Sequence, residues 1–375
     1  MERINIPAEL VEEILSRVSA KSLARFRSTC KGWRALLKSG SFAERQSSKA
    51  PKESLIIMLM DFRVYLVRIN LDGIHNNLAP TFKYQLYFED PLFDSLQVDI
   101  RRVFHCDGLL LCTTRDNRLV VWNPCLGETK WIKPTNSYDY SDNYALGYEN
   151  QSSCKKHKIL MMYPGCHYYH SGIYDVFELY DFASDSWKEL DVPTKWRLRY
   201  SSYDQDGMSL KGNTYWLAND YTNDFLLRFD FSLEIFSSIA LPHCFPFMVK
   251  EISVVREDQL FLLTTDSVNP ADSHVWVATS TGSDMSWSKF QTLKANLEGY
   301  NSGLSFLPEE QYKFLLVCYN DYSSDNKILH IVGENEHIRV DLGGRNSKCI
   351  FSVLNYVPSL AQIQQAKGRH QGRDL

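Results

Sequence analysis

Four side chains of types that bind zinc lie close together near the middle of this 375-residue chain. Cys154, His157, Cys166 and His170 follow the pattern Cys-x2-His-x8-Cys-x3-His, and thiolate and imidazole are ordinary zinc ligands. However, residues 158–163 between them have the composition of a β-strand, and three neighbouring lysines add positive charge. The pattern therefore favours a polar loop beside a hairpin, and we expect no metal and no cofactor.

Motifs of the common enzyme classes are missing from the sequence. There is no Gly-x-Ser-x-Gly elbow, no phosphate-binding Gly-x-x-x-x-Gly-Lys loop, no dinucleotide-binding glycine pattern and no His-Glu-x-x-His. The basic run 155–158 and the segment 196–199 could suggest RNA binding with stacking aromatics. Because residues 51–375 hold 40 acidic against 31 basic residues, a solvated strand face is the better interpretation. We expect no catalytic residue and no nucleic-acid partner.

Composition and charge divide the chain into two modules. The first 50 residues hold ten Lys and Arg against five Asp and Glu, whereas the remainder holds 31 against 40. The longest apolar run, Leu55 to Met60, is far below the roughly 18 residues of a membrane span. The N-terminus has no basic stretch followed by an apolar core, and the cysteine count is nine, an odd number. We expect free thiols, no membrane partner, and a location in the cytoplasm, the nucleus or both.

The basic module has the periodicity of short amphipathic helices. Pro7 stands where a helix tolerates proline, and apolar residues then recur every three or four positions from Leu10 to Val18. A second helical pattern follows Ser19, a residue type that caps helices. Some 45 residues of helix make a poor independent core. The apolar faces must therefore pack on a partner or on the rest of this chain, two alternatives with about equal support from the periodicity.

Segments 6–18, 21–27 and 30–37 of this module resemble an F-box motif over some 30 ordered positions. The resemblance implies that the helices bury their apolar stripe against a Skp-type adaptor and, through it, join a cullin. The residues that it places at this adaptor interface are Ile6, Pro7, Leu10, Ile14, Leu15, Val18, Leu23, Phe26 and Trp33.

The acidic module reads as a succession of β-hairpins. Asn123, Asp181 and Asp230 each follow an apolar run and precede a returning one, with spacings of roughly 50 residues. Further hairpins between them make four strands per period, the spacing of kelch-like propeller blades. Ring closure predicts that strand 350–356 pairs beside strand 55–60. A β-sandwich of similar strand content is the alternative.

Several pieces of this region resemble the F-box-associated domain of a large plant family. They include Cys106 to Leu110, Val121 to Pro124, Ser209 to Leu217 and Phe229 to Phe231, in the order of that family. The predicted fold is thus a multidomain α+β chain. It has a three-helix F-box at residues 1–45, an all-β propeller-like domain at 46–357, and a disordered tail at 358–375.

The function implied by the resemblance is substrate recognition in a Skp–cullin–F-box ubiquitin ligase. The helices would bind the adaptor, and the β domain would hold an unknown target protein for ubiquitination. The long Tyr-rich loops 138–144, 163–174 and 219–223 have a composition that suits protein recognition. The alternatives are a glycan-binding or enzymatic propeller tethered by an F-box, and an F-box protein that acts outside ubiquitin transfer.

Overall fold

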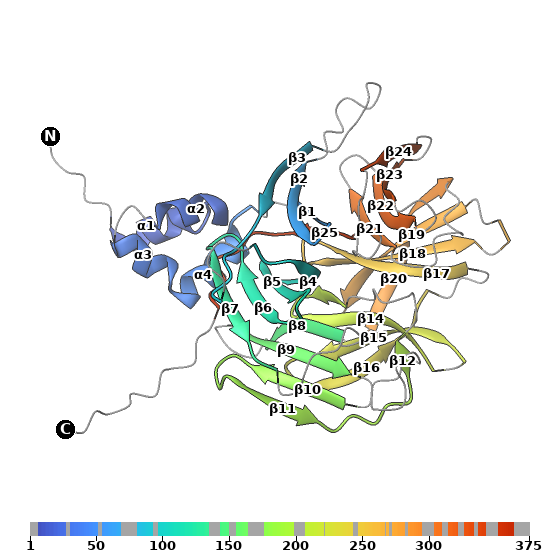
Figure 1. Ribbon diagram of the computed structural model, residues 1–375, viewed down its shortest axis with the longest axis horizontal. Coiled ribbons are helices and arrows are strands. Elements are labelled where there is room, and N and C mark those ends of the chain that lie inside the picture. The colour runs from blue at the N-terminus through green and yellow to red at the C-terminus, as the bar shows by residue number, and fades with distance from the viewer. Residues whose placement is uncertain are drawn as a thin grey trace.

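The computed structural model places four helices beside a ring of β-sheets (Figure 1). The structure describes residues 7–27, 31–51, 55–68, 81–92, 97–134, 143–149, 155–163, 176–198, 207–220, 222–242, 247–266, 268–269, 272–281, 284–294, 304–309, 314–321, 326–333, 337–342 and 352–363. The helices lie against the outer part of one sheet, next to strands β6 and β7 (Figure 1).

The β domain is a six-bladed propeller, and each blade is an antiparallel sheet of neighbouring strands. Six separate sheets exclude the β-sandwich alternative. The first blade contains β1 (Leu55–Met60), β2 (Arg63–Arg68), β3 (Thr81–Leu86) and β25 (Ser352–Tyr356). The second contains β4 (Ile100–Cys106), β5 (Leu109–Thr114), β6 (Leu119–Asn123) and β7 (Glu128–Ile132), and the third β8 (Asn143–Glu149), β9 (Lys156–Tyr163), β10 (Val176–Asp181) and β11 (Ser186–Leu190).

The remaining three blades follow in chain order. The fourth contains β12 (Arg197–Leu198), β13 (Met208–Leu210), β14 (Asn213–Asn219), β15 (Asp224–Asp230) and β16 (Ile235–Ile239). The fifth contains β17 (Phe247–Val255), β18 (Gln259–Asp266), β19 (Asp272–Thr281) and β20 (Asp284–Lys294). The sixth contains β21 (Ser305–Glu309), β22 (Phe314–Asp321), β23 (Asn326–Val332) and β24 (His337–Asp341).

Strand β25 closes the ring, as the sequence predicted. It pairs antiparallel with β1, with Leu55 opposite Tyr356 and Leu59 opposite Ser352. The C-terminal strand thereby supplies the inner position of the first blade. This pairing protects an edge that an open sheet would expose.

The three hairpins identified from Asn123, Asp181 and Asp230 have the same type of turn. In each, the side-chain Oδ1 accepts hydrogen bonds from the backbone N–H groups two and three residues later. In each, the residue four positions later has a positive φ and donates its N–H back to the first residue's carbonyl. A short side-chain acceptor at the first position thus fixes the bend. This local geometry explains why the repeat is visible in the sequence.

The helical module contains α1 (Ala8–Leu15), α2 (Ala20–Phe26), α3 (Lys31–Leu37) and α4 (Gly40–Lys49). The described residues thus hold four helices instead of the predicted three. Helix α4 continues through position 45, so the predicted domain boundary falls inside it. Phe42 of α4, which is 1% exposed, joins the core that α1, α2 and α3 share. Ser19 does stand at the N-cap of α2, but its hydroxyl donates to Ser22 Oγ at 3.1 Å.

Residues 358–363 correct the prediction of a disordered tail that begins at 358. They run from β25 to the helices as a packed segment, which we call the strap. Leu360 of the strap is 1% exposed and lies in the same core as the helices. Ile363 of the strap is also buried, in the core between the second and third blades. The polar composition of the following residues concealed both apolar anchors. The rest of the predicted tail, 364–375, lies outside the described residues.

Candidate adaptor-docking site

Helix α1 carries two apolar stripes that face different surroundings. Leu10 and Ile14 form the outer stripe and are 54% and 56% exposed. Val11 and Leu15 form the inner stripe and pack into the core between the helices and the propeller. Each pair is spaced by four residues, so each occupies one helix face, and the two faces are about 100° apart. One helix thus presents apolar side chains to the molecule's own core and to its surface.

Exposed apolar groups also lie before α1 and on the neighbouring helices. Pro7 and Phe26 are exposed, and Phe26 packs edge-to-face on the half-buried Trp33 with ring centroids 5.2 Å apart. Exposed apolar side chains that gather on one surface are typical of a binding site. We call Pro7, Leu10, Ile14, Phe26 and Trp33 the outer face of the helical module.

Three other residues predicted for the adaptor interface lie beneath this face. Leu15 and Leu23 are buried, at 8% and 0% exposed, and Val18 is half-buried against the same core. In this structure they position the helices against the propeller. Ile6, the ninth predicted residue, lies outside the described residues.

The core beneath the outer face joins the two modules. Leu23 packs with Leu126 from the β6–β7 turn and with Leu360 from the strap. Sequence separations of more than 100 residues hid these contacts from pattern analysis. The nearest signal was the odd placement of an apolar residue, Leu126, inside a polar turn.

Polar contacts add to this junction. Arg27 forms an ion pair with Glu128 of β7 at 3.1 Å, and Gln46 Nε2 donates to the Val18 carbonyl at 3.0 Å. On the solvent side, hydrogen bonds from Lys49 and Arg17 lower the pKa of Glu13. The helices are therefore held to the propeller by an apolar core and the Arg27–Glu128 ion pair, whereas the contacts of Gln46 and Glu13 stabilise the helical module itself.

Comparison with known proteins assigns both modules. Residues 55–363 match the family model of the F-box associated beta propeller domain, and residues 4–45 match that of the F-box domain. The chain belongs to this F-box family. "Putative F-box protein At3g23260" of Arabidopsis thaliana is 48% identical over 97% of this chain and 100% of its own length. "Putative F-box protein At3g21120" of the same plant is 44% identical over 96% of this chain and 100% of its own length.

These matches confirm the F-box and the plant-type propeller that the sequence predicted. The matching propeller family is distinct from kelch repeats, so the kelch-like character of the blades stays a prediction. None of the helices that the structure describes is long and apolar enough to cross a membrane.

A cluster of buried charges lies at the base of the propeller, where the F-box sits. Asp107, at the β4–β5 turn, forms an ion pair with Lys155 and a hydrogen bond with His157, whose Nε2 is 3.2 Å from Oδ2 of the carboxylate. Burial opposes ionisation of Asp107, but the His157 hydrogen bond and the Lys155 charge outweigh it and lower the carboxyl pKa. Lys155 also lies over the Tyr148 ring, 4.5 Å from its centroid.

One residue of the zinc pattern considered for this region, His157, belongs to that cluster. His157 directs Nε2 to a carboxylate, and β9 is the predicted strand between the cysteines. Cys154, Cys166 and His170 lie outside the described residues. Among the described residues no group of three or more zinc-ligating side chains comes together.

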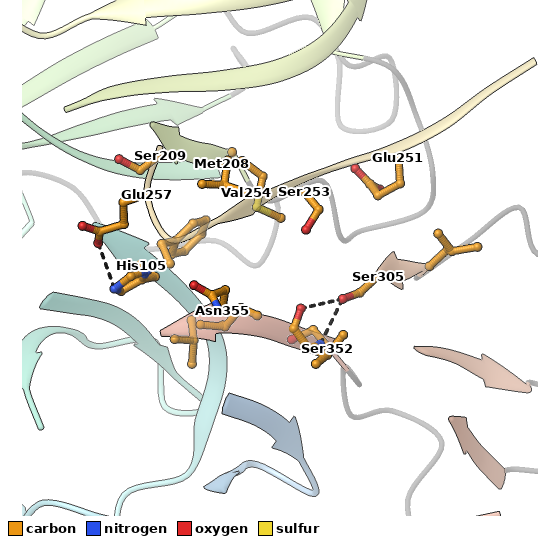
Figure 2. Close-up of a pocket in the computed structure, with 16 residues that line it drawn as sticks. His105, Met208, Ser209, Glu251, Ser253, Val254, Glu257, Ser305, Ser352 and Asn355 are labelled. Atoms are coloured by element: carbon orange, nitrogen blue, oxygen red, sulfur yellow. Dashed lines mark hydrogen bonds and ion pairs between the residues drawn. The ribbon is translucent and has the colours of Figure 1, made fainter. Parts of the chain in front are cut away.

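The inner strands of the blades surround a narrow central channel (Figure 2). His105, Glu257 and Asn355 lie at one part of it, with His105 Nε2 3.1 Å from Glu257 Oε1, and Glu251 lies farther along it. The cavity between them has a volume of about 60 Å³, enough for a few water molecules.

The Tyr-rich loops remain largely unplaced. Positions 138–142 and 164–174 lie outside the described residues, as does Tyr221 of the third loop. The described part of that loop forms the β14–β15 turn, in which Asp220 Oδ1 accepts hydrogen bonds from Thr222 and Asn223.

Proposed function

We propose that this F-box protein is the substrate-recognition subunit of a Skp–cullin–F-box ubiquitin ligase. The carrying observation is the outer face, where Leu10 and Ile14 remain more than half exposed although the same helix buries Leu15. An F-box implies a Skp-type adaptor as partner, and exposed apolar patches mark protein interaction sites. The propeller would then hold a target protein.

The proposed role is non-catalytic. The chain would act by proximity, because holding a target beside the ligase's ubiquitin-charged enzyme raises the effective concentration of target lysines. The buried junction around Leu23, Leu126 and Leu360 supports this role. A fixed connection limits the distance between adaptor and target.

The alternative of a glycan-binding or enzymatic propeller has no separate observation in its favour among the described residues. The alternative of an F-box protein outside ubiquitin transfer has no separate observation in its favour. We also expect the blades to be kelch-like and the protein to act in the cytoplasm, the nucleus or both.

Capture by a purified Skp-type adaptor tests this proposal. The full-length double variant Leu10→Asp/Ile14→Asp should lose capture, because an apolar interface cannot bury two unpaired carboxylates. Val268→Asp is the matched control, since Val268 is a 79% exposed apolar residue of the propeller. Circular dichroism would establish that each variant is folded. Retained capture by the folded double variant would overturn the interface.

A further inference from the structure

Strand β16 differs from the outer strands of the other five blades in its charge. An outer strand exposes backbone N–H and C=O groups, and natural proteins protect such edges with charged residues. Each of the other five outer strands, β3, β7, β11, β20 and β24, carries at least one Lys, Arg, Asp or Glu. Strand β16, Ile-Phe-Ser-Ser-Ile, carries none.

The edge of β16 is also accessible. Among the described residues, β16 pairs with β15 alone. Ile235 is 50% exposed, and Ser238 is exposed as well. Every second residue of an antiparallel edge strand turns its N–H and C=O away from its neighbour. The strand therefore offers hydrogen-bonding positions to another extended chain.

A groove of about 1610 Å³ runs along the whole of β16. Segment 191–197 lines one part of it, and the β14–β15 turn lines one end. The β15–β16 turn is the counterpart of the β6–β7 turn that contacts the F-box. Since antiparallel strands alternate in direction, the β14–β15 turn lies on the propeller face away from the F-box. The groove thus reaches that face as well as the outer rim of the fourth blade.

The lining of this groove combines aromatic and acidic groups. Trp196 and Phe236 are half-buried, with ring centroids 5.1 Å apart, and present apolar surface beside the strand. Asp220 and Asp224 are exposed at the end with the β14–β15 turn. The charged residues that line the groove are Asp191, Asp220, Asp224 and Glu234 against Lys195 and Arg197. Glu234 is ion-paired with Lys158 and Lys188, so the acidic excess comes from the three aspartates.

We propose that β16 is the docking edge for an extended segment of the target protein, which adds to the fourth blade as a new outer strand. Backbone hydrogen bonds would supply affinity, and side-chain contacts would supply specificity. Trp196 and Phe236 would favour an apolar side chain on the bound segment. The carboxylates of Asp220 and Asp224 would favour basic residues at its end nearest to them. A second copy of this chain fits less well, because residues 51–375 hold 40 acidic against 31 basic residues. This inference rests on the proposed substrate-recognition role.

The test uses full-length protein and a fluorescein-labelled peptide of alternating lysine and valine, six residues long. Its matched control is the same peptide with every second amide N-methylated, which removes donors needed for strand pairing. We expect the first peptide to bind at least tenfold more tightly in fluorescence anisotropy. Equal affinities of the two peptides would overturn the proposal, as would the absence of binding.

Variants of the chain test whether the peptide binds at β16. Ser238→Pro removes a backbone donor and should weaken binding at least tenfold, whereas Ser238→Ala should leave it unchanged. Glu189→Pro, at the corresponding position of β11, is the control for a proline in an outer strand and should also leave binding unchanged. If Ser238→Pro does not fold, the N-methylated peptide still decides the outcome. Unchanged binding to folded Ser238→Pro would overturn the assignment to β16.

Two further measurements separate the possible causes of failure. The adaptor should capture Ser238→Pro as well as it captures the unaltered protein. A Ser238→Pro variant that no longer binds the peptide but is still captured by the adaptor therefore supports the inference. Absent capture by the unaltered protein would reject the ligase role, whatever the peptide does. A dimer in sedimentation that Ser238→Pro dissociates would assign the edge to a second copy and overturn the proposal.

Discussion

Asn123 donates its side-chain amide to the backbone carbonyl of Ala361 at 2.8 Å, across 238 positions of sequence. The same amide donates to the Ser359 carbonyl at 3.2 Å. Its Oδ1 meanwhile caps the β6–β7 turn, as Asp181 and Asp230 do in their blades. An aspartate at position 123 would cap the turn but donate nothing to the strap. The amide therefore ties a repeating turn to the segment that reaches the F-box.

This relationship predicts a large effect of Asn123→Asp on stability. The new carboxylate would face two carbonyl oxygens in a site that is fully buried, so we expect a loss of about 2 kcal/mol or more in the free energy of unfolding. Urea denaturation of the full chain measures it. Asp181→Asn is the matched control, because it keeps the capping oxygen, and it should change stability by under about 1 kcal/mol. Equal effects of the two variants would contradict the dual role of Asn123.

Buried and exposed leucines of the helical module should respond differently to truncation. Leu23→Ala should cost about 2 to 5 kcal/mol, because it opens a cavity in the core shared with Leu126 and Leu360. Leu10→Ala should cost under about 0.5 kcal/mol, since Leu10 is 54% exposed. Thermal and urea unfolding of both variants compare them. A small cost for Leu23→Ala would show that the helices do not pack on the propeller in solution.

The aromatic part of the outer face predicts a hot spot for the adaptor. Phe26→Ala removes an exposed ring that packs edge-to-face on Trp33, and we expect about a tenfold loss of adaptor affinity. Titration calorimetry with a purified Skp-type adaptor gives the dissociation constant. Tyr84→Ala, at a 46% exposed aromatic residue of β3, should leave it unchanged. Equal affinity of Phe26→Ala and the unaltered protein would place the interface elsewhere.

A pair of histidines in the sixth blade predicts acid sensitivity. His330 Nδ1 lies 2.5 Å from His337 Nε2, and burial, followed by the charges of His337 and Arg339, lowers the pKa of His330 to about 4. In the unfolded chain the pKa is about 6.5, so the unfolded state binds more protons between these values. The stability contribution of His330 is therefore complete above about pH 6.5 and is lost as the pH falls towards 4.

His337→Gln tests this dependence, because it removes one positive neighbour and should raise the pKa of His330. When the pH falls from 7 to 4.5, the free energy of unfolding should decrease by about 1 kcal/mol less in this variant than in the unaltered protein. This value allows for screening by solvent. Urea denaturation across this range provides the comparison. Parallel stability curves for the two proteins would contradict the coupling.

Sequence alone determined the features that short segments fix by themselves. The apolar period of the helices requires only residues one turn apart. The Asn123, Asp181 and Asp230 hairpins need one side-chain acceptor and the following four residues, so their repeat was readable. Ring closure followed from a general requirement, because an open sheet edge needs a partner, and β25 does pair with β1.

Only the tertiary structure decided which apolar surfaces of these elements are buried and which are exposed. Leu10 and Leu15 are alike in the sequence, yet one faces water and the other faces Leu126 and Leu360. The number of blades, the fourth helix at 40–49 and the packed strap were likewise settled by contacts between distant segments. Burial depends on which surfaces the whole chain brings together, and periodicity records only that a face is apolar. The open edge of β16 also became visible only once the blades were assembled.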